Sequence, residues 1–372
     1  MRKTYVLAAL ITGLAGLERN ALANGWNMPV GVTEVSRHVH GLHMTIFWIC
    51  VVIGAVVFSV MFYSLFRYRR SKGAQAANFH EHTTVEIFWT AIPLLILVAM
   101  AIPATATLRH MYDASEADLE VMVTGHQWRW HYDYVGEDVG YFSNLTTPRE
   151  QIDGTQAKDA NYLLEVDQPL VLPVDRKVRL LMTSSDVIHS WWVPDLAVKK
   201  DAIPGFVNEA WTRIDEPGIY RGQCAELCGK DHGFMPVVVH AMAQDEFDAW
   251  LAERKQEAAA AASGVDRNWT LPELMERGEQ VYGSICASCH QPEGQGLPPT
   301  FPALVGNQAL LEDLEGHIDT VVNGVAGTPM PAFSGTLNAV DIAAVITFER
   351  NAWGNDTGDI IQPSTIQAQL SP

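Results

Sequence analysis

Two long apolar segments that contain no charged residue constrain the fold of this chain more than any other feature. They cover residues 45–66 and 87–108. Each is long enough for a helix to cross the ~30 Å hydrocarbon core of a membrane, which takes about 20 apolar residues. Because no water is present there to satisfy backbone groups, each segment must be helical. A buried helix of a soluble protein is the alternative, but such a helix rarely stays uncharged over this length. We therefore expect a transmembrane hairpin.

The residues around these segments predict the orientation of the hairpin. The short loop between them contains Arg67, Arg69, Arg70 and Lys72, and by the positive-inside rule it faces the cytoplasm. Residues 1–23 have the charged start, apolar stretch and small-residue cleavage site of a signal peptide. An uncleaved anchor is the alternative, although the apolar stretch is short for one. Residues 24–118 then hold the hairpin, and we expect both ends of the mature chain to face the outside of the cell.

Charge is distributed unevenly along the chain, whose net charge is -18. Residues 1–118 contain nine Lys or Arg and seven Asp or Glu, whereas the remaining residues contain 16 and 36. Binding to nucleic acid requires a basic surface, so we expect no nucleic-acid partner. A basic protein is the better match for an acidic exported region.

From residue 119 onwards, short β-rich segments alternate with turn residues. This pattern is typical of an antiparallel sandwich or barrel, and it predicts an all-β domain over residues 119–241. The expected strands cover residues 119–124, 128–134, 162–166, 178–182, 207–214, 218–222 and 236–241. After them we expect a linker over residues 242–270, with an Ala-rich helix at 245–262. An all-α domain over residues 271–355 should follow, with one helix at 274–286 and an amphipathic one at 338–350. Residues 356–372 form a tail.

The motif Cys-x-x-Cys-His at residues 286–290 is typical of covalent attachment of haem c. Cys286 and Cys289 can bond the two vinyl groups, and His290 then ligates the iron. A redox-active dithiol would not need the following histidine, and a zinc site would need further ligands nearby. Met330 lies between two prolines in a rigid loop and is the expected sixth ligand, with Met275 as its rival. A Met/His pair raises the reduction potential and suits electron transfer. This region resembles a class I cytochrome c.

A second cluster of metal-ligand residues lies in the β-rich region. Cys224, Cys228, His232 and Met235 fall within twelve residues, and sulfur together with nitrogen favours copper. Two cysteines four positions apart can bridge two metal ions, an arrangement that needs a second histidine, for which His189 is the candidate. A Cys224–Cys228 disulfide and a Cys₂His₂ zinc site are the alternatives, but neither gives a role to Met235.

Together these features resemble subunit II of the haem–copper cytochrome c oxidases, whose β domain is a cupredoxin. The similarity covers about residues 35–250, and the C-terminal haem domain matches the bacterial form with a fused cytochrome c. The motifs that carry it are Gly-His-Gln-Trp-Arg-Trp (125–130), Val-Ile-His-Ser-Trp-Trp-Val-Pro (187–194), Asp-Ala-Ile-Pro-Gly (201–205) and the Cys224–Met235 loop.

The resemblance implies a role for each residue of the copper loop. Cys224 and Cys228 would bridge the binuclear CuA centre, with His189 and His232 as terminal ligands. The remaining two positions are Met235, which would be a weak axial ligand, and Glu226, which would bind through its backbone carbonyl. The Glu226 side chain would also reach a magnesium ion shared with subunit I.

Two further positions are assigned by the resemblance alone. Trp128 matches the aromatic residue through which electrons enter the copper site. Its usual aromatic neighbour is Arg129 here, which is a departure from the family pattern. Glu86 matches a glutamate at the mouth of a proton path in subunit I, and a plain interfacial carboxylate is the alternative.

The function implied by the resemblance is that of one subunit of a terminal oxidase. Electrons would pass from an external donor, expected to be a basic cytochrome, to haem c, CuA and the oxygen-reducing centre of subunit I, coupled to proton translocation. Subunit III is a further expected partner. A quinol oxidase subunit II lacks the copper ligands, a nitrous oxide reductase carries a large additional domain, and a copper-delivery factor would not need the haem motif.

Overall fold

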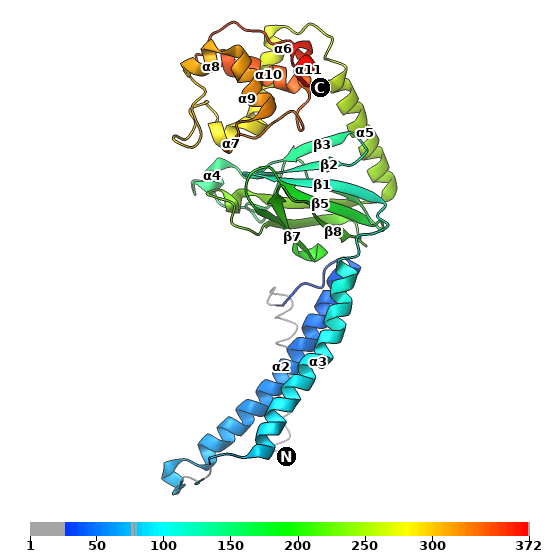
Figure 1. Ribbon diagram of the computed structural model, residues 1–372, viewed down its shortest axis with the longest axis vertical. Helices are drawn as coiled ribbons and strands as arrows, with labels where there is room; N and C mark the ends of the chain where they lie inside the picture. The colour runs from blue at the N-terminus through cyan, green and yellow to red at the C-terminus, as the bar shows by residue number, and fades with distance from the viewer. Residues whose placement is uncertain (1–26, 76–77, 79, 371–372) are drawn as a thin grey trace. The chain divides into compact units, whose positions relative to one another are not determined.

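The computed structural model describes residues 27–75, 78 and 80–370, which form two compact units. The first contains the hairpin up to Asp113 together with residues Pro194–Ala197, and the second contains residues Ala114–Val193 and those from Val198 onwards. Figure 1 traces both along the chain. The expected signal peptide lies outside the described residues.

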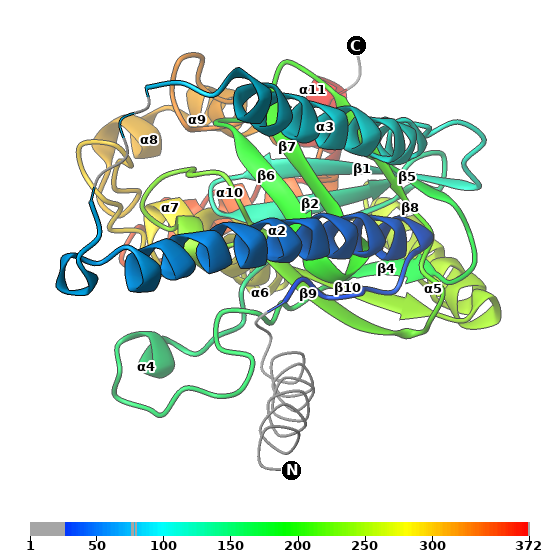
Figure 2. The same ribbon diagram turned by 90° about the horizontal axis from the view of Figure 1, so that it is seen from below.

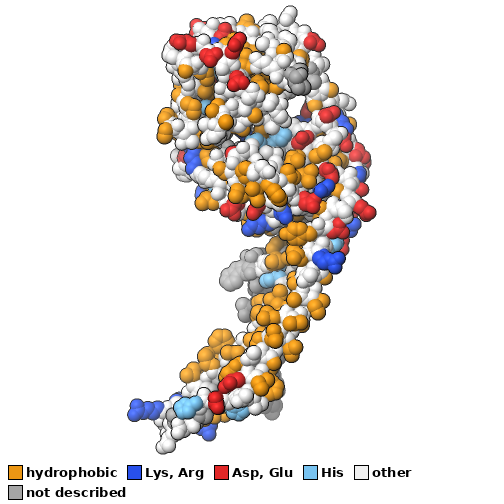
Figure 3. Space-filling model, viewed as in Figure 1, with side chains coloured by type: hydrophobic (Ala, Val, Ile, Leu, Met, Phe, Trp, Pro, Cys, Tyr) orange, Lys and Arg blue, Asp and Glu red, His pale blue; other side chains and the backbone are white. Residues whose placement is uncertain are grey.

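The first unit is built on two long helices, α2 (Glu34–Arg67) and α3 (Thr83–Met111). Both are long and apolar enough to cross a membrane, as expected from the sequence, and Figure 3 shows apolar side chains along them. Thr33 begins α2 with a capping box, in which its hydroxyl accepts the Ser36 N–H at 2.9 Å. A short 3₁₀ helix, η1 (Arg70–Lys72), lies in the basic loop.

The second unit contains a sheet of ten strands in the order β3-β2-β1-β5-β7-β6-β9-β10-β4, with β8 paired to β5. Figure 2 shows the neighbouring strands β9 and β10. The bounds are β1 Leu119–His126, β2 Arg129–Tyr134, β3 Val139–Ser143, β4 Leu170–Pro173, β5 Val178–Ser184, β6 His189–Val193, β7 Val198–Pro204, β8 Asn208–Thr212, β9 Gly218–Cys224 and β10 Pro236–Met242. Short helices α4 (Arg149–Ile152), η2 (Pro194–Leu196) and η3 (His232–Phe234) lie between strands.

Two expectations for the β domain are wrong. The sheet is mixed rather than antiparallel, because β1 pairs with β5, β5 with β7 and β10 with β4 in parallel. The expected strand at residues 162–166 is absent from the described structure, where Val166 forms one isolated bridge with Leu145. Leu163 has φ +60°, outside the extended region, and the Asn161 carbonyl accepts a turn hydrogen bond from Leu164 at 2.8 Å.

Helix α5 (Gln244–Ala262) occupies most of the expected linker and packs on the β domain. The Phe247 and Trp250 rings lie 6.3 Å and 5.3 Å from the buried Tyr134 ring, measured between centroids. Aromatic contacts at these distances stabilise the packed arrangement beyond the area that they bury. The connection between the β-rich and helical regions therefore begins with an ordered helix.

The C-terminal region is helical, as expected. Its elements are α6 Leu271–Val281, the π-helical turn η4 Tyr282–Cys286, α7 Ala287–His290, α8 Gln308–Glu312, α9 Leu314–Asn323, α10 Ala339–Asn351 and α11 Pro363–Leu370. Helix α10 is buried almost all round rather than on one face, so the expected amphipathic pattern is wrong. At Gly278 of α6, a Cβ atom would lie 2.2 Å from the Ala344 carbonyl oxygen, so the two helices approach as closely as they do because this residue is glycine.

Candidate copper and haem sites

The candidate copper site lies where β9 ends. Cys224 is its last residue, and the following loop brings Cys228 back so that the two Sγ atoms lie 3.8 Å apart. Both thiols are free and buried. A disulfide needs an S–S distance of about 2.05 Å, so the structure does not contain the disulfide alternative.

Each of the two sulfur atoms lies close to one histidine ring. His189 Nδ1 lies 3.9 Å from Cys224 Sγ, and His232 Nδ1 lies 3.5 Å from Cys228 Sγ. His189 comes from the start of β6 and His232 from η3. Two sulfur atoms side by side, each with one nitrogen, form a donor set that suits two soft metal ions.

His189 is held in place from two sides. Its Nε2 bonds to the Asp186 carboxylate at 2.8 Å, which leaves Nδ1 facing the sulfur. Behind the ring, a Cβ atom at Gly125 would lie 2.7 Å from His189 Cδ2, so β1 approaches the ring closely because this position is glycine. Asp186 was not predicted as a site residue, since nothing in the sequence alone shows that it reaches His189.

Burial opposes the charged form of His189, but the Asp186 carboxylate and the Cys224 sulfur outweigh it and raise the pKa of the imidazole. The hydrogen-bonded pairing of the two sulfur atoms lowers the pKa of Cys224 to about 3 and raises that of Cys228. One thiolate is therefore already stabilised in the site, and thiolate is the form that binds metal.

Met235 and Glu226, the other two expected ligands, both approach Cys224 through their backbone carbonyls. Met235 is buried, and its carbonyl accepts the Cys224 N–H at 3.0 Å. The Glu226 carbonyl lies 3.3 Å from Cys224 Sγ, whereas the side chain is exposed. The Cys228 carbonyl accepts from Gln127 Nε2 at 2.7 Å and Trp128 Nε1 at 3.1 Å, so the predicted entry residue Trp128 directly contacts the loop.

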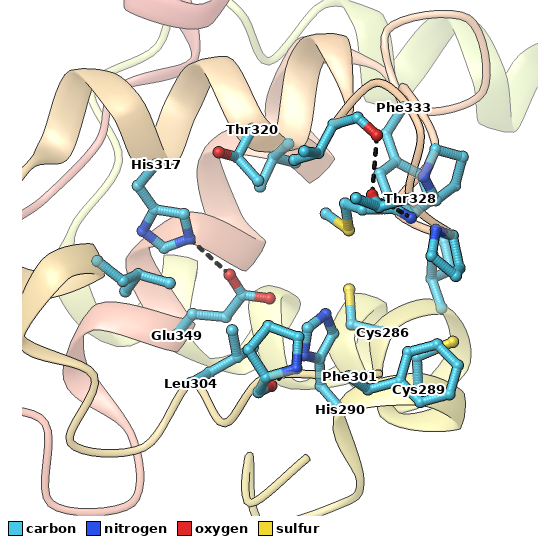
Figure 4. Close-up of a pocket in the computed structure, with 18 of the residues that line it drawn as sticks. Cys286, Cys289, His290, Phe301, Leu304, His317, Thr320, Thr328, Phe333 and Glu349 are labelled. Atoms are coloured by element: carbon cyan, nitrogen blue, oxygen red, sulfur yellow. Dashed lines mark hydrogen bonds and ion pairs between the residues drawn. The ribbon is translucent and has the colours of Figure 1, made fainter. Parts of the chain in front are cut away.

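The candidate haem site is a cavity of about 620 Å³ in the second unit. Cys286, Cys289, His290 and Met330 all line it. His290 Nδ1 bonds to the Pro302 carbonyl at 2.9 Å, which leaves Nε2 for a ligand. In Figure 4, Cys286 and His290 lie on one side of the cavity and Thr328 on the opposite side. Cofactor cavities of about 300–1,000 Å³ are typical, so the size and the donor set both fit a haem.

Two lining residues were not predicted from the sequence. His317 on α9 and Glu349 on α10 form a buried pair at 2.8 Å, shown dashed in Figure 4. Met275, the rival sixth ligand, lies on α6 and packs against the hydrophobic core of the helical region. Glu86 belongs to the first turn of α3, where its carboxylate accepts the His82 N–H at 3.2 Å.

Sequence models of three protein families match the chain. The model described as cytochrome C oxidase subunit II, periplasmic domain, matches residues 119–242, and the corresponding transmembrane domain matches residues 21–106. A third, described as cytochrome C oxidase, cbb3-type, subunit III, matches residues 273–348. With the fold described above, these matches confirm a two-helix transmembrane hairpin, an all-β cupredoxin domain and an all-α cytochrome c domain.

Two relatives agree with these matches. A probable cytochrome c oxidase subunit 2 from Rickettsia bellii is 38% identical over 227 residues, which are 61% of this chain and 83% of that protein. A cytochrome c oxidase subunit 2 from Cereibacter sphaeroides is 31% identical over 284 residues, 68% of this chain and 93% of that protein. The solved periplasmic domain of subunit II of cytochrome oxidase from Bradyrhizobium japonicum is 37% identical, covers 39% of this chain and 98% of its own, and has a TM-score of 0.35.

Proposed function

Since the chain belongs to the cytochrome c oxidase subunit II family, we propose the route that electrons take through it as a subunit of a haem–copper terminal oxidase. They enter at a covalent haem c, pass to a binuclear CuA centre and continue to the oxygen-reducing centre of subunit I, coupled to proton translocation. The observation that carries the proposal is the pairing of two adjacent sulfur atoms, Cys224 and Cys228, with one imidazole each.

The chain's own residues hold the copper ions in this proposal. Cys224 and Cys228 would hold both ions as thiolate ligands, and His189 and His232 would each supply one nitrogen ligand. The buried Met235 and the Glu226 carbonyl would complete the set. A site whose ligands are fixed by a sheet, by the Asp186 hydrogen bond and by the contact at Gly125 moves little when its charge changes, which favours fast electron transfer.

The haem is held by the helical region. Cys286 and Cys289 would bond it, His290 would ligate the iron with its Nε2, and Met330 would supply the other iron ligand. The Met330 carbonyl accepts the Val325 N–H at 3.0 Å, which closes the loop that presents the thioether. A Met/His ligand pair suits one-electron transfer rather than oxygen binding.

The hairpin and the periplasmic domain make this a membrane protein that works with subunit I. We further propose a bacterial inner membrane as its location, subunit III as a second partner and a basic cytochrome as donor, because the haem domain has many acidic residues and few basic ones. In the same proposal the exposed Glu226 carboxylate binds a magnesium ion shared with subunit I, and Glu86 marks the entry of a proton path.

Stopped-flow reduction of the purified oxidase tests the route. We expect haem c to be reduced first and the copper centre next. In Cys228→Ser, haem c should still be reduced while electrons no longer reach subunit I. Glu150→Gln, a surface change in the same domain, is the control. If the Cys228→Ser oxidase reduced subunit I at the rate of the unmodified enzyme, the proposed route would be wrong.

A further inference from the structure

Arg129 connects the β domain to the haem-binding helices. It is the first residue of β2, and its side chain is buried. One terminal nitrogen, Nη1, donates to the Ile285 carbonyl, and it lies 3.5 Å from both the Ser284 carbonyl and the Ser288 hydroxyl. These three residues belong to η4 and α7, the turns that contain Cys286 and Cys289.

Burying a guanidinium group at this position carries an energetic cost. Burial lowers the pKa of Arg129, and among the described residues its Nε has no hydrogen-bond partner. The guanidinium carbon lies 4.5 Å from the centre of the Phe142 ring, a favourable cation–π distance. A buried charge is tolerated where its partners compensate for the lost water, and here most of those partners are backbone and hydroxyl oxygens of the haem-binding segment.

Other contacts join the same two surfaces. The Trp128 ring lies 6.5 Å from the Phe301 ring, edge to face, and Trp128 also donates to the Cys228 carbonyl. Cys289 lines the same cavity as Arg129 and Asp186, which both belong to the β domain. Asp186 is the partner of the copper-site residue His189. The haem-attachment residue Cys289 and the hydrogen-bond partner of a copper-site histidine therefore line one cavity.

We propose that Arg129 is a positioning residue that fixes the haem-binding domain against the β domain, beside the copper loop. Haem c would then transfer its electron from one docked position rather than from a mobile, tethered domain. The inference rests on the proposed function and deepens it. The step would carry one electron from the reduced haem to the copper pair, with no bond made or broken and no proton transferred. A fixed contact of this kind keeps the distance between haem and copper short at every turnover. A flexible tether alone sets only the effective concentration of the haem domain near the copper site.

The test is the rate of electron transfer from haem c to copper in the whole oxidase after photoreduction of the haem, measured over a range of solvent viscosity. In the unmodified protein we expect a rate that does not depend on viscosity. In Arg129→Gln we expect a roughly ten- to hundredfold slower rate, the equivalent of one lost charge-assisted hydrogen bond, which then falls as viscosity rises. Arg129→Lys should recover part of the rate, since it restores the charge but not the fork of donors.

Arg149→Gln, at an exposed arginine in the same domain, is the matched control and should behave as the unmodified protein does. Haem and copper spectra of each variant establish that both sites are loaded. A viscosity-dependent rate in the unmodified protein, or an unchanged rate in Arg129→Gln, would overturn the proposal that Arg129 fixes the docked position. Even if Arg129→Gln failed to fold, the viscosity series on the unmodified protein would still distinguish a docked haem domain from a mobile one. Absence of either spectrum from the unmodified protein would instead refute the proposed function.

Discussion

The Asp186 carboxylate bonds to His189 Nε2 at 2.8 Å, on the side of the ring opposite the nitrogen that faces Cys224. A histidine ligand oriented in this way by a carboxylate binds metal with a fixed tautomer and a more basic nitrogen. Asp186 also accepts the Gln127 N–H at 2.7 Å. It thereby links the histidine ligand to the segment that supports Cys228.

Replacing Asp186 by Asn should weaken copper binding without removing a ligand. Loss of such an outer partner typically lowers metal affinity by about 10–100-fold. Competition with a copper chelator measures the change, with Asp153→Asn, at an exposed position, as the control. Equal affinity in Asp186→Asn and Asp153→Asn would show that the hydrogen bond does not orient the ligand.

Replacing Met330 by His should lower the reduction potential of haem c, because the thioether ligand raises it. Potentiometric titration followed by haem absorbance measures the shift. Met275→Leu is the matched control, since Met275 packs against the core and should leave the potential unchanged. A shift in Met275→Leu with none in Met330→His would exchange the roles of the two methionines.

The stability of the β domain should decrease in mild acid because His131 is buried without charge. Burial, together with the nearby Arg129, lowers its pKa from 6.5 to about 4. The native state therefore binds fewer protons than the unfolded chain between these values, so its stabilisation is complete above about pH 6.5 and is lost as pH falls towards 4. The maximum loss is ~3 kcal/mol, at 1.36 kcal/mol for each pKa unit.

Thermal unfolding midpoints measured from pH 7 to pH 4 test this effect. In His131→Phe the unfolding midpoint should decrease less as pH falls. Part of the decrease should remain, because the pKa of His126 is also lowered, to about 3, mainly by burial. His240→Phe is the control, at a histidine that is only partly buried in the same domain. Identical pH profiles for the unmodified protein and His131→Phe would show that His131 does not contribute.

Gly278→Ala should destabilise the haem-binding domain, although alanine normally favours a helix by about 1 kcal/mol. The added Cβ would lie 2.2 Å from the Ala344 carbonyl, and forcing atoms into a packed core costs about 1–3 kcal/mol. Gly283→Ala is the control, since a Cβ there meets no atom within 4 Å. Denaturant unfolding followed by haem absorbance measures both. A domain as stable in Gly278→Ala as in Gly283→Ala would contradict the close packing of α6 on α10.

Features encoded in a short stretch of sequence could be predicted, and features that depend on distant neighbours could not. The two membrane helices follow from uncharged length alone, and the clusters at Cys224–Met235 and Cys286–His290 are local. The parallel pairing of β1 with β5 depends on how distant strands meet. In the same way, nothing in the sequence distinguishes Asp186 from other loop aspartates, because its contact with His189 forms only in the folded chain. The contact of Arg129 with Ile285 likewise forms only in the folded chain.

The most direct test of the account is electron paramagnetic resonance of the oxidised oxidase, combined with its copper-to-haem c ratio in this subunit. We predict two copper ions for each haem c, with one unpaired electron shared equally between two copper nuclei. In Cys224→Ser or Cys228→Ser the shared signal should disappear. A single copper ion, or a signal from one copper nucleus in the unmodified protein, would contradict a centre bridged by these two sulfur atoms.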